Sequence, residues 1–147
     1  MAFMLTSPSF TTGERIPRRF TCDGDDARPA LAWTDPPAAT GGFLIVVEDP
    51  DAPSGTFLHY AAWDLPADLR QLPEGAEAPS EGRNGFGSVG WRGPCPPRGG
   101  EHHYVFRLIA LERPLDADPG AAWDEVEPQI PERFVAEAQL VGRYGRI

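Results

Sequence analysis

The chain has 147 residues and a mass of 16.0 kDa, which suits one domain and is too short for two ordinary hydrophobic cores. Apolar residues make up 41% and charged residues 24%, a globular composition that argues against global disorder. A net charge of −9 disfavours nucleic acid and anionic membranes as partners, because a polyanion repels both. All 13 basic residues are arginine, so lysine-amine chemistry is excluded. We expect one domain over residues 1–147.

Three apolar segments predict the principal strands. Residues 43–47 are apolar and rich in β-branched side chains, which predicts a strand buried on both faces that ends at the turn around Pro50. A second strand is expected at residues 59–65, after a turn rich in proline and glycine. Residues 103–111 form the third, with the even-numbered side chains from Tyr104 to Ala110 on one face.

Shorter strands are expected near residues 3–6, 18–21 and 31–33. Helix is expected only near the C-terminal end. Residues 121–127 are compatible with two helical turns before Pro128. A second helix is expected to begin at Pro131, where Phe134, Ala138 and Val141 recur near helical spacing, and to end at Gly142.

Turn-forming residues are dense along the whole chain, with 17 prolines and 16 glycines. They divide it into short pieces, as in an all-β sandwich or barrel with substantial loops. No repeat, low-complexity segment or charged linker marks an internal boundary. The predicted fold class is therefore mainly β.

The N-terminal residues have neither the basic region nor the apolar run of a secretory signal. The longest strongly apolar stretch, residues 43–47, is much shorter than a membrane span. These features favour a cytoplasmic protein without integral membrane association. In a reducing cytosol, Cys22 and Cys95 are expected to be free thiols, although pairing would contribute about 4 kcal/mol by closing a long loop.

Three histidines and two aspartates stand at predicted strand ends and turns, where a β scaffold holds binding groups in place. They are His59, His102, His103, Asp49 and Asp51. A carboxylate beside an imidazole accepts one ring N–H, sets the tautomer and favours a protonated ring. An imidazole held in this way donates to an anionic oxygen, and the backbone N–H groups of a glycine-rich turn add further donors. The pattern is compatible with a small anion site.

Other interpretations of these residues stay open. The Asp-Pro-Asp turn at residues 49–51 also suits a structural Asx turn, and two histidines with one carboxylate suit a metal site whose geometry nothing in the sequence sets. Serine-hydrolase, Walker and dinucleotide-binding motifs are absent, and Cys95 between two prolines suits a structural role. We predict neither a cofactor nor a metal.

A set of motifs follows in order along nearly the whole chain, from about residue 5 to residue 146. The central ones are Asp49-Pro-Asp-Ala-Pro53, His59, Gly93-Pro-Cys-Pro-Pro97 and His102-His-Tyr104. Together they resemble the phosphatidylethanolamine-binding protein family. Further segments look like its bacterial branch, often called Raf-kinase-inhibitor-like: Phe20-Thr-Cys-Asp-Gly24, Leu31-Ala-Trp33, Asn84-Gly-Phe-Gly87 and Val141-Gly-Arg-Tyr-Gly-Arg146.

The resemblance implies a sandwich of antiparallel sheets with Greek-key connections and short C-terminal helices. It also implies a small cavity at one end that binds phosphate-like anions and phospholipid headgroups. Carried over to this chain, the cavity residues are Asp49, Asp51, His59, Gly93, Pro94, His102 and Tyr104. His59 and His102 would donate to the anion. The two aspartates would orient the imidazoles and the nearby backbone, while Pro94 and Tyr104 would form walls.

Two positions depart from the family pattern. Bacterial members usually flank the first histidine with aromatic residues, as in Trp-His-Trp, whereas this chain has Leu58 and Tyr60. An aliphatic Leu58 at a position that often helps to wall the cavity weakens the expectation of cation–π recognition of an ammonium headgroup. The second motif is commonly His-Arg-Tyr, so His103 replaces a permanent positive charge with a titratable one.

Three functional hypotheses follow. The first is a non-enzymatic binding module for a small anionic or phosphorylated ligand, with modulation of a protein partner as an extension. The second is an interaction protein of the kinase- or protease-inhibitor type. The third is an uncharacterised hydrolase, resting on acid–histidine pairs beside a cavity. The resemblance also allows a homodimer, since bacterial relatives often crystallise as dimers.

Overall fold

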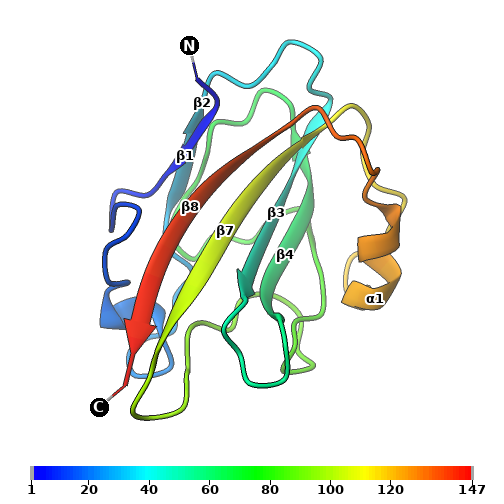
Figure 1. Ribbon diagram of the computed structural model, residues 1–147. Helices are drawn as coiled ribbons and strands as arrows, with labels where there is room; N and C mark the ends of the chain where they lie inside the picture. The colour runs from blue at the N-terminus through cyan, green and yellow to red at the C-terminus, as the bar shows by residue number, and fades with distance from the viewer. Residues whose placement is uncertain (1, 147) are drawn as a thin grey trace.

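Two antiparallel sheets pack face to face in the computed structural model, which describes residues 2–146 (Figure 1). The smaller sheet has the strand order β1-β2-β5 and the larger one β6-β4-β3-β7-β8. The strands are β1 (Met4–Thr6), β2 (Leu31–Thr34), β3 (Gly42–Asp49), β4 (Phe57–Pro66), β5 (Gln71–Leu72), β6 (Ser80–Glu81), β7 (Glu101–Leu111) and β8 (Ala136–Gly145). The helical turns are η1 (Arg18–Phe20), α1 (Trp123–Val126) and η2 (Glu127–Gln129). The structure confirms a mainly β sandwich with short helices near the C-terminal end.

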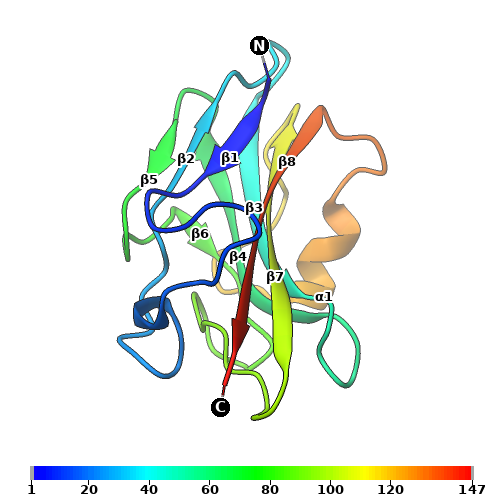
Figure 2. The ribbon, with the colours of Figure 1, turned by 60° about the vertical axis from the view of Figure 1, so that its left-hand side comes forward.

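The larger sheet has both faces covered. Figure 2 shows it between the smaller sheet on one side and α1 on the other. Its central strand, β3, is buried from Gly42 to Val47 and pairs with β4 on one edge and β7 on the other. The prediction that residues 43–47 form a strand buried on both faces is confirmed.

The two cores follow from alternation along the strands. On β7, Phe106 and Leu108 point into the core between the sheets, while Ile109 and Leu111 point into a second core under the helices. Phe106 is 0% exposed and lies against the rings of Phe10 and Trp91. The predicted division of residues 103–111 into two faces is thus confirmed.

The helix expected from Pro131 to Gly142 is wrong, because residues 136–145 form β8. Ten residue pairs join β8 to β7, from Ala136 opposite Ala110 to Gly145 opposite Glu101. This long pairing satisfies the backbone of β8, which the local spacing of apolar residues cannot reveal. Gly142 does not end a helix but lies within β8. A Cβ at this position would lie 2.5 Å from the Ile16 side chain, so the close packing there requires glycine. The strand expected at 18–21 is also wrong, because residues 18–20 form the helical turn η1.

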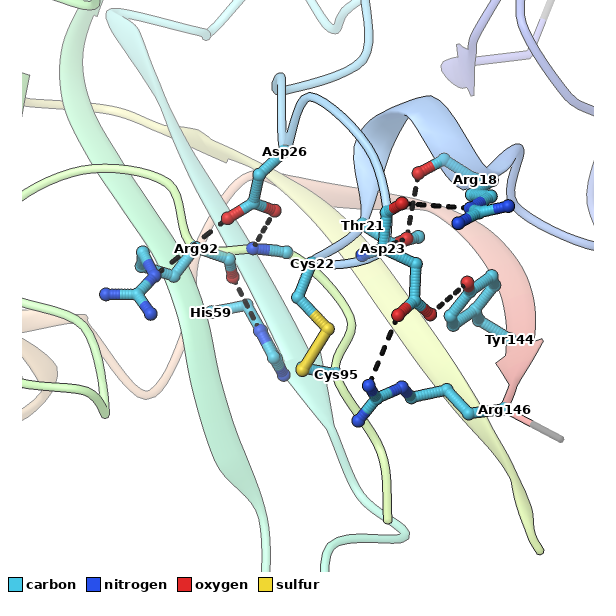
Figure 3. Close-up of a disulfide and its surroundings, with 11 residues drawn as sticks. Arg18, Thr21, Cys22, Asp23, Asp26, His59, Arg92, Cys95, Tyr144 and Arg146 are labelled. Atoms are coloured by element: carbon cyan, nitrogen blue, oxygen red, sulfur yellow. Dashed lines mark hydrogen bonds and ion pairs between the residues drawn. A yellow bond between two sulfur atoms is a disulfide. The ribbon is translucent and has the colours of Figure 1, made fainter. Parts of the chain in front are cut away.

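Cys22 and Cys95 form a disulfide, contrary to the expectation of free thiols (Figure 3). They are 73 positions apart in the sequence, yet their Cα atoms are 5.4 Å apart. The tertiary structure brings them together because residues 18–26 fold against residues 91–100. The Cys22 N–H donates to the carbonyl of Pro94 at 3.1 Å, and the Gly93 N–H donates to Asp26 at 2.9 Å.

No helix within residues 2–146 combines the length and the apolar character that crossing a bilayer requires. Three strand ends meet at the lower end of the larger sheet in Figure 1: the end of β3, the start of β4 and the start of β7. The loop of residues 91–100, here called the pocket loop, leads into β7 at this same end. These segments build the candidate site.

Candidate functional site

A pocket of about 150 Å³ lies where these strand ends meet. Its lining combines two imidazoles, one carboxylate and one phenol with a mostly apolar remainder: Asp49, Ala52, Pro53, Phe57, His59, Phe86, Cys95, Pro96, Pro97, His102 and Tyr104. An apolar pocket with a few convergent polar groups is the usual form of a small-ligand site.

Asp49 and His102 form the most buried polar pair of the pocket. The His102 Nδ1–H donates to Asp49 Oδ2 at 2.6 Å, with side-chain exposures of 13% and 5%. The other carboxylate oxygen of Asp49 accepts the backbone N–H of Asp51 at 2.8 Å, which holds the turn after β3. The pair fixes the tautomer of His102 and leaves its Nε2 for other partners.

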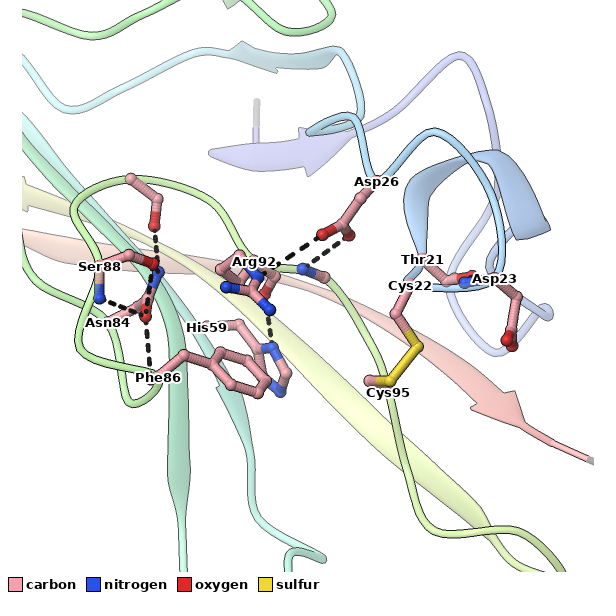
Figure 4. A network of polar contacts seen from close by, with 12 residues as sticks. Thr21, Cys22, Asp23, Asp26, His59, Asn84, Phe86, Ser88, Arg92 and Cys95 are labelled. Carbon is pink, nitrogen blue, oxygen red and sulfur yellow. Dashed lines mark hydrogen bonds and ion pairs between the residues drawn. A yellow bond between two sulfur atoms is a disulfide. The ribbon is translucent and has the colours of Figure 1, made fainter.

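His59 enters the pocket because β4 carries a bulge at this position. Val47 pairs with Tyr60 and the next residue, Glu48, pairs with Leu58, so His59 is left as the extra residue. Bulges redirect a side chain and are common beside binding sites. The His59 Nδ1–H donates to the carbonyl of Arg92 in the pocket loop at 2.6 Å, which sets the ring orientation (Figure 4).

Burial lowers the pKa of His59 below its ordinary value. The hydrogen bond to the Arg92 carbonyl and the negative charges of Asp49 and Asp26 oppose this effect but do not outweigh it. The His59 ring is therefore neutral near pH 7, and its Nε2 becomes a donor only when the ring takes up a proton.

The Tyr104 hydroxyl is buried and has no hydrogen-bond partner within residues 2–146. Its pKa is raised, first by burial and then by the negative charges of Asp49 and Asp51, so the group stays protonated. Because a buried hydroxyl without a partner costs free energy, this O–H is a candidate contact for a bound molecule.

Aromatic rings form the outer wall, and they come from positions that the sequence analysis missed. Phe57 lies 5.1 Å from the His59 ring and 4.9 Å from the ring of Phe86, centroid to centroid. The Arg92 guanidinium lies 4.7 Å from the Phe86 centroid. Leu58 instead packs in the core under the helices, so the expectation that this position walls the cavity is wrong. Because Leu58 is not part of the wall, its aliphatic side chain does not reduce the aromatic character of the wall.

The structure brings together four of the seven residues expected at the cavity: Asp49, His59, His102 and Tyr104. Gly93 and Pro94 are buried behind the wall, which Cys95, Pro96 and Pro97 form in their place.

Asp51 is not among the residues that line the pocket, and it holds His103. Asp51 Oδ2 accepts both the backbone N–H and the Nδ1–H of His103 at 2.8 Å, in an exposed pair. These contacts lower the pKa of the Asp51 carboxyl. His103, which stands where the resembling family commonly has arginine, is therefore outside the pocket lining.

One of the missed residues left a signal in the sequence. Phe57 lies two positions before His59, a spacing that places both side chains on one side of a regular strand. Phe86 stands in the family-like segment Asn84-Gly-Phe-Gly87, but nothing in that segment indicated that its ring, 45% exposed on a loop, reaches the pocket.

Two further observations concern alternative sites outside this pocket. A larger hollow of about 490 Å³ near the start of β8 is bordered by exposed charged residues, among them Glu112, Arg113 and Arg133, and has no histidine. Among residues 2–146, no group of three or more His, Cys, Asp or Glu side chains is arranged to hold a metal ion.

Comparison with known proteins gives the family. Residues 6–145 match the model of the phosphatidylethanolamine-binding protein family. The chain belongs to this family. A UPF0098 protein of Aquifex aeolicus is 42% identical over 148 residues, which cover 95% of this chain and 86% of that protein. The UPF0098 protein YbhB of Escherichia coli is 34% identical over 155 residues, with coverages of 95% and 98%.

Solved structures of the family agree with this fold. CT736 of Chlamydia trachomatis, named as a phosphatidylethanolamine-binding protein homologue, has a TM-score of 0.92 at 31% identity and 99% coverage of both chains. YbcL of Escherichia coli, named as a member of the mammalian family, has a TM-score of 0.92 at 29% identity and 100% coverage of both chains. The resemblance to the bacterial branch is confirmed.

Proposed function

We propose that this chain is a non-enzymatic binding protein whose pocket takes a small oxyanion, either free or as the phosphoryl group of a headgroup or a modified side chain. The observation that carries the proposal is the buried Tyr104 hydroxyl, which has no partner within residues 2–146 and stands beside two oriented imidazoles. A pocket of about 150 Å³ has room for one phosphoryl group.

The geometry suits an anion in spite of the net charge of the chain. When protonated, His59 and His102 each have an N–H besides the one used to orient the ring. Asp49 holds the orientation of His102 by accepting its Nδ1–H. The mostly apolar lining lowers the local polarity, which strengthens charge-assisted hydrogen bonds inside the pocket. The aromatic wall adds a surface for the organic part of a phosphorylated ligand.

The second candidate is the hydrolase, and the Asp49–His102 pair favours it, since a carboxylate-held imidazole is a potential general base. Cys95, the cysteine of the pocket lining, is in a disulfide and offers no thiol nucleophile in that state. Turnover of an ester or phosphate panel that disappears in Asp49→Ala would establish this alternative.

Modulation of a protein partner, a homodimer and a cytoplasmic location stay predictions from the sequence.

Sulfate affinity is expected to increase as the pH falls from about 8 to about 5.5. Sulfate is a suitable probe because it stays a dianion over this range. Any change of its affinity with pH therefore reflects protonation of the protein. Since burial lowers the pKa of His59, the free ring is neutral at pH 7, and binding the dianion favours uptake of a proton. Imidazole and amide NMR titrations measure the affinity, with phosphate and phosphoethanolamine as further ligands.

Two variants make this test specific. His59→Ala should weaken sulfate binding at least about tenfold in acid, the value of one charge-assisted hydrogen bond. His103→Ala is the matched control, because this imidazole is exposed and pairs with Asp51 outside the lining. The absence of saturable shifts, or equal losses in both variants, would refute an anion site at His59.

Replacing Tyr104 with phenylalanine is expected to separate stability from binding. The hydroxyl contributes no hydrogen bond within residues 2–146, so its removal should leave the free energy of unfolding within about 1 kcal/mol of the original value. Sulfate affinity should fall about two- to tenfold, because the ligand loses one donor. Urea unfolding and the same titration check both parts. Unchanged affinity would place Tyr104 outside the ligand contacts.

A further inference from the structure

The Cys22–Cys95 disulfide joins the pocket wall to a segment far away in the sequence. Cys95 is one of the lining residues, and Cys22 belongs to residues 18–26, which pack beside the pocket loop (Figure 3). Both cysteines are exposed to solvent. An exposed disulfide is accessible to thiolate attack, whereas a buried one is shielded from it. The bond is therefore a reactive group placed in the wall of the candidate site.

The segment that carries Cys22 is held in place without the disulfide. Asp23, the next residue, accepts the Tyr144 hydroxyl at 2.6 Å and lies 3.2 Å from the Arg146 guanidinium. The Thr21 hydroxyl donates to the carbonyl of Arg18 at 2.8 Å within the same segment. Breaking the disulfide would leave this side anchored to the end of β8. The pocket loop would keep its backbone hydrogen bonds at Arg92, at Pro94 and at Gly99, whose N–H donates to the carbonyl of Arg146 at 3.0 Å. The residues between these bonds, 95–97, are therefore the ones that lose a restraint.

The pocket loop also carries the group that orients His59. The carbonyl of Arg92, three residues before Cys95, accepts the His59 Nδ1–H at 2.6 Å (Figure 4). Two hydrogen bonds hold this part of the loop to residues 18–26, from Gly93 N–H to Asp26 and from Cys22 N–H to Pro94. After Cys95 the loop continues through Pro96 and Pro97, which also line the pocket. Along the loop, Cys95 therefore comes between the residue that orients His59 and the two prolines of the wall.

We propose that the Cys22–Cys95 disulfide is a site of thiol–disulfide exchange with a dithiol, and that its redox state sets the affinity of the pocket. The oxidised bond holds the proline wall and the His59-orienting carbonyl in their binding arrangement. Reduction releases the wall and weakens anion binding. The affinity argument rests on the proposed function, since it concerns the same pocket.

The exchange is a two-electron step in which the dithiol is the reductant. One thiolate of the dithiol attacks a sulfur of the protein disulfide, forms a mixed disulfide and displaces the other cysteine as a thiolate, which takes up a proton. The second thiolate of the dithiol then attacks the mixed disulfide and displaces the remaining cysteine. The products are two protein thiols and an oxidised, cyclic dithiol. No metal or further cofactor is needed.

The test compares sulfate titrations of the oxidised protein, the protein reduced with dithiothreitol and the reduced protein after reoxidation. Sulfate affinity is expected to fall at least about fivefold on reduction, because the binding arrangement is then only partly populated, and to return on reoxidation. The double variant Cys22→Ser, Cys95→Ser should bind like the reduced protein and should not respond to dithiothreitol. Far-UV circular dichroism should be the same in all states.

A second readout separates this proposal from the proposed function. The His59 imidazole signals, recorded without ligand, should shift on reduction, since the loop that carries the orienting carbonyl loses its covalent restraint three residues away. If sulfate does not bind the oxidised protein but these signals still shift, the anion site fails and the redox coupling stands. Equal sulfate affinity in both redox states with unchanged His59 signals would overturn the redox proposal. Loss of the folded spectrum on reduction would also overturn it, because the bond would then govern the whole fold.

Discussion

Gly93→Ala is expected to lose stability and sulfate binding together. A Cβ at residue 93 would lie 2.2 Å from the carbonyl oxygen of Phe20 and 2.5 Å from Asp26 Oδ1. The nearer of these atoms belongs to the backbone, so the pocket loop must move away from residues 18–26. We expect a loss of about 2 kcal/mol in the free energy of unfolding, as for an overpacked site. Sulfate affinity should fall at least about tenfold, because the neighbouring carbonyl of Arg92 orients His59.

Gly100→Ala is the matched control for this prediction. It adds the same methyl group to the same loop, but a Cβ there meets nothing within 4 Å. Its stability and sulfate affinity should match those of the unaltered protein. Urea unfolding and NMR titration measure the two quantities for both variants. If Gly93→Ala also behaved normally, the close packing of the pocket loop against residues 18–26 would not govern the site.

Phe106→Ala is expected to reduce the free energy of unfolding by about 3 to 5 kcal/mol. The Phe106 side chain is 0% exposed in the core between the two sheets. Its ring lies 5.7 Å from that of Phe10 and 6.0 Å from that of Trp91, centroid to centroid. The close neighbours belong to separate parts of the fold, so the cavity left by alanine cannot collapse without moving the packed sheets.

The control for Phe106→Ala is the same chemical change at an exposed position. Phe86 is 45% exposed, and Phe86→Ala should cost less than about 1 kcal/mol. Chemical denaturation with a common m-value compares the two variants. Similar losses at both positions would contradict the assignment of Phe106 to the main core.

The hydrophobic pattern predicted a strand correctly where it follows the burial of the strand's two faces. Residues 43–47 are apolar throughout because β3 is covered on both faces, and residues 103–111 alternate because β7 divides its side chains between two cores. The pattern failed at β8. The buried residues there, such as Ala138 and Leu140, do follow the alternation of a strand, but Phe134 and Val141 also allowed a helical spacing. Pairing with β7 decided between the two.

The candidate site was predictable only in part, because its residues reach it by different routes. Asp49, His59 and Tyr104 stand in motifs that resemble those of a known family, and all three line the pocket. Phe86 is part of the wall only because its loop folds over the start of β4, where it meets the ring of Phe57. The expected role of Leu58 was wrong because the bulge at His59 places Leu58 in the core under the helices.

The sequence by itself determined the class of fold, the principal strands and most of the polar groups of the pocket, since these depend on alternation, turn chemistry and motifs that are local in the chain. Only the tertiary structure decided the disulfide, the strand β8 and the aromatic outer wall of the pocket. Each of these depends on segments far apart in the sequence, such as Cys22 and Cys95, which are 73 positions apart. Their proximity results from long-range strand pairing and from the packing of loops against one another, which no local pattern records.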